Sequence, residues 1–358
     1  MIIFKPRERV LSTLHRRIPD RVPKHIRFTP EYRKILPAKI GTTNYEEYFD
    51  LEVRRVELKL YRGELDFARY YEDLPPNVCF DDWGLPFLPN TEYHKRLELY
   101  PMRSLETVKE LKDYPWPDFL ADYRHSHLEK EIAQIHDEGY AVLGREREVS
   151  GGFIFETAWQ LRGIVSLFKD CYVNKDFANF LLDKIAEING ALVGRFAEAG
   201  VDIIWLGDDI GMQDRPLMSL SFWRKWLKPR LKHLIDSAKQ SNPDVLIFYH
   251  SDGFIEPFIP DLIEIGVDIL NPIQPECLDP VKIKRVYGEG LSFWGTIGIQ
   301  TTMPHGTPKQ VEEAVKRMIE TVGRGGGFLI APCHFIQTDV PWENVIAFFE
   351  AVEKFGKY

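Results

Sequence analysis

The sequence has few cysteines and no long hydrophobic run. Its 358 residues include 4 cysteines, which are far apart and form no Cys-x-x-Cys pair. No disulfide framework is therefore expected, and a reducing compartment is favoured. The first apolar run, Met1–Phe4, is too short for the core of a signal peptide, and no window approaches the ~20 apolar residues of a membrane span. These absences predict a cytoplasmic protein without a membrane anchor.

The sequence also lacks an excess of positive charge. Lys and Arg total 46 against 54 Asp and Glu, and the formal net charge is −8. A nucleic-acid-binding surface is not expected, because phosphates are bound by a basic field, but a local basic pocket for an anionic substrate is compatible with this charge. Short catalytic motifs are absent too, since no Gly-x-Ser-x-Gly, His-Glu-x-x-His or Gly-x-Gly-x-x-Gly occurs. The run Gly325–Gly327 precedes a predicted strand, unlike a phosphate-binding loop.

The order of apolar and amphipathic segments predicts one (β/α)8 barrel. Hydrophobic residues make up 44% of the chain and charged residues 28%, as in ordinary soluble proteins. Barrels of this kind run from about 250 to more than 400 residues. In the second half, near-continuous apolar runs alternate with longer amphipathic stretches, which is typical of a parallel sheet buried on both faces. We expect one α/β domain over residues 1–358, a TIM barrel with an N-terminal helical extension and a long inserted loop.

Eight segments are expected to be strands of this barrel: Val22–Phe28, Asn77–Phe80, Tyr140–Gly144, Asp202–Leu206, Val245–Tyr249, Ile269–Pro272, Leu291–Trp294 and Phe328–Ala331. Eight others are expected to be helices: Arg7–Arg16, Leu128–Asp137, Thr157–Phe168, Lys175–Glu198, Ser221–Lys239, Ile255–Ile265, Pro280–Val286 and Pro308–Val322. The segment Asp82–Phe119 is rich in Pro, Trp and Tyr, and its apolar residues follow neither the helical nor the strand periodicity. It is expected to be a long excursion that either packs on its own aromatic side chains or forms a lid or pocket wall.

Polar side chains follow the predicted strands at their carboxyl ends, where barrel enzymes build their active sites. They are Arg145, Glu146, Arg147, Glu148, Asp208, Asp209, Gln213, His250, Asp252, Gln274, Cys333, His334, Gln337 and Asp339. The acid–base candidates are Glu148, Asp208 and Asp209. Adjacent carboxylates on an extended segment point to opposite sides, so we expect only one of Asp208 and Asp209 to face the pocket, and the alternative role of both is capping.

Arg27 and five of these strand-end residues are candidates for substrate binding. Arg145 and Arg147 are two residues apart and could together bind a substrate carboxylate, although a solvated rim is the alternative. Gln213, Gln274 and His334 complete this set.

His250, Asp252 and Cys333 can converge on a metal ion. His250 and Asp252 are two residues apart, so on an extended segment both side chains point to the same side, and Cys333 ends the last predicted strand. One imidazole, one carboxylate and one thiolate make a plausible zinc site with the open fourth position that a catalytic zinc needs. The structural alternative is a core histidine, a helix cap and a buried thiol.

Several long motifs occur through nearly the whole chain: Arg7–Pro23, Phe80–Gly84, Asp113–Asp118, Gly200–Gln213, His250–Glu276, Phe293–Pro308 and Gly325–Val345. In content and order they resemble the uroporphyrinogen decarboxylase superfamily, and most closely its branch of corrinoid-dependent methyltransferases. The resemblance implies a (β/α)8 barrel, a zinc ion, a small-molecule substrate, a corrinoid carried by a partner protein and, in many members, a homodimer. Carried over by position, the zinc ligands of that branch become His250, Asp252 and Cys333, with Asp252 where other members have a cysteine.

The resemblance leaves three hypotheses for function. True decarboxylases carry RQAGRYLPEY, whose arginines bind an acidic tetrapyrrole, and the matching stretch His25–Lys34 keeps Arg27 but lacks the Gln-Ala-Gly-Arg core. A carboxylate is a harder ligand than a thiolate, so Asp252 favours methyl transfer from an oxygen-bearing donor, such as a methoxylated aromatic, to a corrinoid protein. The alternatives are decarboxylation of a tetrapyrrole or other acidic substrate, using Asp208 or Asp209 with Arg27 and Arg145, and binding of a tetrapyrrole or corrinoid without turnover.

Overall fold

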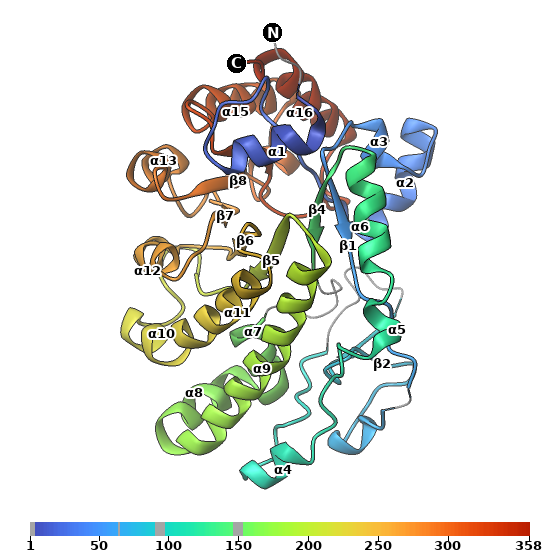
Figure 1. The fold of residues 1–358 in the computed structure, drawn as a ribbon, viewed down its shortest axis with the longest axis vertical. Coiled ribbons are helices and arrows are strands. Elements are labelled where there is room, and N and C mark those ends of the chain that lie inside the picture. Colours follow the sequence, from blue (N-terminus) through green and yellow to red (C-terminus); the bar gives the residue numbers. More distant parts are fainter. Residues whose placement is uncertain (1–3, 64, 90–96, 146–152) are drawn as a thin grey trace.

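A curled parallel sheet with helices around it forms the centre of the protein (Figure 1). The computed structural model describes residues 4–63, 65–89, 97–145 and 153–358. The sheet has 7 strands in the order β1-β4-β5-β6-β7-β8-β9, and neighbouring strands run parallel. They are β1 (Val53–Val56), β4 (Ala141–Gly144), β5 (Ile203–Gly207), β6 (Leu246–His250), β7 (Ile269–Asn271), β8 (Ser292–Ile297) and β9 (Phe328–Pro332). This is the α/β, TIM-barrel-like fold that the sequence predicts.

The helices connect the strands and cover the sheet. They are α1 (Pro6–Leu14), α2 (Pro30–Ile40), α3 (Tyr45–Tyr48), η1 (Ala68–Tyr70), α4 (Val108–Lys112), α5 (Asp122–His125), α6 (Leu128–Asp137), α7 (Phe155–Arg162), α8 (Ile164–Val173), α9 (Lys175–Ala199), α10 (Leu220–Trp226), α11 (Lys228–Ser241), η2 (Glu256–Phe258), α12 (Ile259–Glu264), α13 (Pro280–Tyr287), α14 (Thr302–His305), α15 (Pro308–Thr321) and α16 (Trp342–Phe355). No helix among the described residues is long and apolar enough to cross a membrane.

The segment before α2 occupies the eighth position of the barrel, beside β9. Lys24 and Phe28 form parallel bridges with Ile330 and Ile336, which makes the predicted strand Val22–Phe28 a neighbour of the last strand. On the other side of this segment, a hydrogen bond to the Glu52 side chain joins it to the residues just before β1. The Lys24 N–H donates to Glu52 Oε2 at 3.0 Å, so a buried carboxylate helps to hold the barrel closed at this seam.

One expected strand needs correction, and one barrel strand was not expected. Asn77–Phe80 is not a barrel strand, because Cys79–Phe80 (β2) pairs antiparallel with Pro86–Phe87 (β3) in a separate two-stranded sheet. The barrel strand in that half of the chain is β1, Val-Arg-Arg-Val, which has no apolar run for periodicity to detect. The other six predicted segments, from Tyr140–Gly144 onward, contain or overlap β4 to β9.

Two predicted helices are each broken once. Thr157–Phe168 divides between α7 and α8 at Gly163, whose φ of +86° is outside the helical range. Ser221–Lys239 divides between α10 and α11, where Pro229 takes the second position of the new helix. Helices α2 and α16 were not predicted, and α2 contains an internal proline, Pro37.

The excursion between β1 and α6 packs on its own aromatic side chains. The Trp83 ring is fully buried, 6.4 Å from the Trp116 ring and 5.7 Å from the Phe119 ring in edge-on contacts. The Tyr114 hydroxyl donates to the Trp83 carbonyl oxygen at 2.6 Å. Neither Trp83 nor Trp116 lines the cavity at the strand ends. The described part of this excursion therefore shows the first of the two expected alternatives, packing on its own aromatic side chains, and a role of the segment as a lid or pocket wall stays a prediction.

Glu52 should be a large contributor to stability for a single polar residue. It is fully buried, with its carboxylate 2.9 Å from Arg21 and 3.4 Å from Arg9. We expect Glu52→Ala to lower the free energy of unfolding by about 3–5 kcal/mol, because it removes a buried carboxylate that two guanidinium groups share and leaves the Lys24 N–H without its acceptor. Asp50→Ala is the matched control, since Asp50 also contacts Arg21 at 2.7 Å but is 62% exposed, and should cost less than about 1 kcal/mol. Equal losses in urea unfolding would contradict this role for Glu52.

Candidate active site

The carboxyl ends of β5, β6 and β7 meet at one edge of the barrel. His250, the last residue of β6, is in register with Gly207 of β5 and with Asn271 of β7. Asp209 comes two residues after β5, and Asp252 comes two residues after β6. The structure therefore brings His250, Asp252 and Asp209 together at the strand ends, as their positions in the sequence predict.

A chain of two hydrogen bonds fixes the His250 ring. The Asn271 amide nitrogen donates to the Trp294 carbonyl oxygen at 2.7 Å, which leaves Asn271 Oδ1 facing His250 Nδ1 at 2.5 Å. Because Oδ1 accepts, Nδ1 carries a proton, and the neutral ring then carries its lone pair on Nε2. This arrangement is typical of metal-binding histidines, whose second nitrogen is held by an outer hydrogen-bond partner.

The lone pair of His250 points toward two other possible metal ligands, Asp252 and His334. These three residues are called the metal group below. One ligand atom each from His250, Asp252 and His334 lies within 4.8 Å of the other two, and His250 Nε2 is 3.9 Å from Asp252 Oδ1. Burial raises the pKa of Asp252 to about 6, His250 opposes the shift and Asp209 adds to it, although 36% of the side chain is exposed. Two imidazoles and one carboxylate suit a divalent metal ion with open positions, so the residues present fit such an ion.

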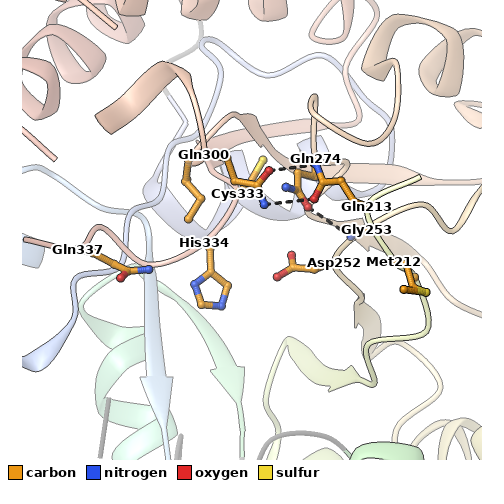
Figure 2. A pocket seen from close by; sticks show the side chains of 11 residues that line it. Met212, Gln213, Asp252, Gly253, Gln274, Gln300, Cys333, His334 and Gln337 are labelled. Atoms are coloured by element: carbon orange, nitrogen blue, oxygen red, sulfur yellow. Dashed lines mark hydrogen bonds between the residues drawn. The ribbon is translucent and has the colours of Figure 1, made fainter. Parts of the chain in front are cut away.

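Cys333 does not belong to this group. Its side chain is buried, and the Sγ atom lies 3.8 Å from the Pro272 carbonyl oxygen. Burial, and next the nearby Glu276 carboxylate, raise the pKa of the thiol well above its usual value. In Figure 2 the sulfur points away from the Asp252 carboxylate and the His334 ring. The structure thus brings two of the three predicted ligands together with His334, a residue predicted to bind substrate, and leaves Cys333 aside.

Asp208 and Asp209 point to opposite sides of the chain. Asp209 Oδ1 accepts the Asp252 N–H at 2.8 Å and lies 3.9 Å from His250 Nε2. Asp208 instead accepts the N–H groups of Ile154 and Glu156 at the start of α7, at 3.2 and 2.9 Å. Only Asp209 therefore lies at the metal group, whereas Asp208 caps a helix that follows a different strand.

A cavity of about 360 Å³ opens beside the metal group. Asp252, His334 and Cys333 line it, together with the predicted residues Gln213 and Gln274 (Figure 2). Two further glutamines complete the polar lining. Gln337 is one of the strand-end residues noted in the sequence, and Gln300, which follows β8, was missed although the same rule applies to it.

The predicted arginines lie elsewhere at the barrel mouth. The Arg27 guanidinium is 4.4 Å from the Trp205 ring and 4.1 Å from the Phe335 ring, and that of Arg145 is 4.3 Å from Trp205. With Arg54 they line a separate, narrow cavity of about 40 Å³ that shares no lining residue with the larger one. Arg147 and Glu148 lie outside the described residues. Substrate binding by Arg27 and Arg145 stays a prediction.

Comparison with known proteins identifies the family. A model of the uroporphyrinogen decarboxylase (URO-D) family matches residues 5–355. The chain belongs to the URO-D family. The resemblance seen in its long sequence motifs is therefore confirmed.

Relatives in the URO-D family include both methyltransferases and decarboxylases. The methylcobamide:CoM methyltransferase MtaA of Methanosarcina barkeri is 26% identical over 198 residues, and the match spans about half of each protein, 55%. A uroporphyrinogen decarboxylase of Legionella pneumophila is 23% identical over 357 residues, 96% of each chain. The structure of a methyltransferase from Methanosarcina mazei covers 98% of this chain and 99% of its own, with a TM-score of 0.69 and 19% identity. The last match shows that the two proteins share a fold. Because a fold does not determine the reaction, the residues at the strand ends must distinguish methyl transfer from decarboxylation.

Asp208 should make the stability of the protein depend on pH. Burial raises the pKa of Asp208 from 3.8 to about 7, against the opposing effect of the backbone N–H groups. Between these pH values the folded protein holds a proton that the unfolded chain has released, so the free energy of unfolding falls as the pH rises. We expect Asp208→Asn to flatten this part of the profile. Urea unfolding of the wild-type protein and the variant across this pH range measures the free energy of unfolding at each pH. Parallel profiles would show that Asp208 is not the group responsible for the pH dependence.

Proposed function

We propose that this URO-D family protein transfers a methyl group from a small O-methyl donor, such as a methoxylated aromatic, to a corrinoid protein with the assistance of zinc. The observation that carries the proposal is the group formed by His250, Asp252 and His334, with the lone pair of His250 directed by Asn271. The relative from Methanosarcina barkeri supports the reaction class, since its name identifies a methylcobamide:CoM methyltransferase.

The ligand atoms of this group support an oxygen substrate. His250, Asp252 and His334 would hold the zinc ion, which when bound supplies Lewis acidity to an oxygen that leaves a methyl group. When a C–O bond of the donor breaks in methyl transfer, its electron pair remains on the oxygen, so the leaving group must be stabilised as an alkoxide or phenolate. Nitrogen and oxygen ligands make a harder site than thiolates do, and a hard site suits an oxygen leaving group.

The surrounding residues hold this geometry. Asn271 fixes the protonated nitrogen of His250, and Asp209 accepts the backbone N–H of Asp252 at 2.8 Å, which positions the loop that carries this carboxylate. Both contacts link residues from neighbouring strands, and rigid elements position a site more accurately than free loops do. The adjoining cavity of about 360 Å³ has the size expected of a site for a small molecule.

Decarboxylation of an acidic substrate is the second candidate, and the arginine-lined cavity is the observation that favours it. Arg27, Arg54, Arg55 and Arg145 provide a basic surface for carboxylates. This cavity measures about 40 Å³, which suffices for a few water molecules at ~10–15 Å³ each. The difference in size between the two cavities favours methyl transfer over decarboxylation.

Methyl transfer can be tested directly. Zinc-loaded protein, a reduced corrinoid protein and a panel of methoxyarenes should give the absorbance of methylcobalamin. His334→Ala should lower both the zinc content and the rate by more than about tenfold, since even outer partners of metal ligands contribute about 10–100-fold. Cys333→Ser is the matched control and should keep its zinc content, because Cys333 lies outside the proposed ligand set.

Two outcomes would count against this account. A panel of donors that gives no methylation would overturn the reaction. Loss of zinc in Cys333→Ser, with full zinc content in His334→Ala, would overturn the ligand set. Decarboxylation of uroporphyrinogen by metal-free protein would support the second candidate instead.

A further inference from the structure

Glutamine side chains dominate the polar lining of the larger cavity. One follows each of β5, β7, β8 and β9: Gln213, Gln274, Gln300 and Gln337. Figure 2 shows them around the Asp252 carboxylate and the His334 ring. Four loops thus each contribute the same functional group, a primary amide, to one cavity.

Amide groups offer hydrogen bonds without charge. Each glutamine presents a carbonyl acceptor and an NH₂ donor. Gln213 and Gln300 bond to each other in both directions, with Nε2–Oε1 distances of 3.1 and 3.4 Å. Gln274 Oε1 accepts the Gly253 N–H at 3.3 Å, which leaves its NH₂ group to donate. The lining can therefore recognise a ligand that both donates and accepts.

The carboxylates Asp252 and Glu276 are the charged groups in the described lining and at the rim of this cavity. Asp252 lines it, and Glu276 lies next to its rim, where Glu276 Oε1 accepts the Gln300 N–H at 3.2 Å and the Thr301 hydroxyl at 2.9 Å. Glu276 Oε2 is buried without a hydrogen-bond partner among the described residues. No lysine or arginine belongs to the described lining.

A bound metal ion would balance this negative charge without reversing it. A divalent ion at the metal group brings two positive charges, and Asp252 and Asp209 bring two negative ones, with Asp209 Oδ1 3.9 Å from His250 Nε2. Glu276 adds a further negative charge, and Arg27, whose positive charge acts on Asp252, adds a further positive one. An anionic substrate would lose hydration on entering and gain no net attraction in return.

We infer that the glutamine-lined cavity binds an uncharged substrate that carries hydrogen-bond donors and acceptors, and that it discriminates against carboxylate and sulfonate analogues. The inference rests on the proposed function for the reaction and names the class of methyl donor, a neutral O-methyl compound with an amide or hydroxyl group. Met212 and Ile299 also line the cavity and provide apolar contact for the carbon skeleton of the donor.

A matched pair of ligands tests this inference, namely a dimethoxybenzamide and the dimethoxybenzoate with the same ring pattern. The two have nearly the same shape and differ in charge. Binding to the full-length protein as purified is measured by calorimetry, with saturation-transfer NMR for weak complexes. The amide should bind more tightly by roughly tenfold or more, because like charges placed side by side cost several kcal/mol. Equal or tighter binding of the benzoate, or no binding of either ligand, overturns the inference.

A pair of variants links the selectivity to this cavity. Gln337 is an exposed residue on its rim, so Gln337→Arg should shift the affinity ratio toward the benzoate by about fivefold to tenfold, as a new positive charge close to the ligand would. Gln240→Arg makes the same exchange on the exposed surface of α11, outside the cavity lining, and should leave the ratio within about twofold of the original, because a distant surface charge is screened. An identical ratio in both variants would show that the ligands bind elsewhere and would overturn the inference.

Binding and turnover can fail separately. Selective binding of the amide without any methylation leaves the substrate class standing and removes the proposed reaction. Methylation from the benzoate as fast as from the amide keeps the reaction and removes the substrate class.

Discussion

His250 Nδ1 donates to Asn271, and Asn271 donates to the carbonyl oxygen of Trp294, so three neighbouring strands fix the direction of one imidazole. The lone pair of Nε2 must then point at the space shared with Asp252 and His334. Without Asn271 the ring could turn or change its tautomer, and the same three side chains would no longer present a set of acceptors to one ion. The proposed chemistry therefore depends on a hydrogen bond made outside the ligand set.

The barrel mouth is divided into two regions of opposite character. Arginines gather on the side of β1 and β4, against the ring of Trp205, while carboxylates, imidazoles and amides gather at the ends of β5 to β9. Arg27, between Trp205 and Phe335, lies where the two regions meet. Methyltransferases and decarboxylases both occur among the relatives of this chain, and one fold can host several reactions because function depends on the site and not on the fold.

Strand positions could be predicted from the sequence where the strands are buried on both faces, because such strands are apolar runs. They could not be predicted where polar residues interrupt the run. Strands β5 to β9 are apolar runs that end in polar residues, so both their positions and most of the site could be predicted. Strand β1 could not, because Arg54 and Arg55 interrupt its apolar pattern. The sequence analysis grouped Cys333 with His250 and Asp252, whereas the structure places His334 beside them, for a related reason. Adjacent residues point to opposite sides, and the sequence does not reveal which of the two faces the site.

The nature of the atoms around the metal tests this account most directly. X-ray absorption spectroscopy at the zinc edge, on purified zinc-loaded protein, separates sulfur from lighter ligands by distance. The set His250, Asp252 and His334 predicts nitrogen and oxygen neighbours alone, at about 2.0–2.2 Å. A sulfur neighbour at about 2.3 Å would place the thiolate of Cys333 on the metal and contradict the account.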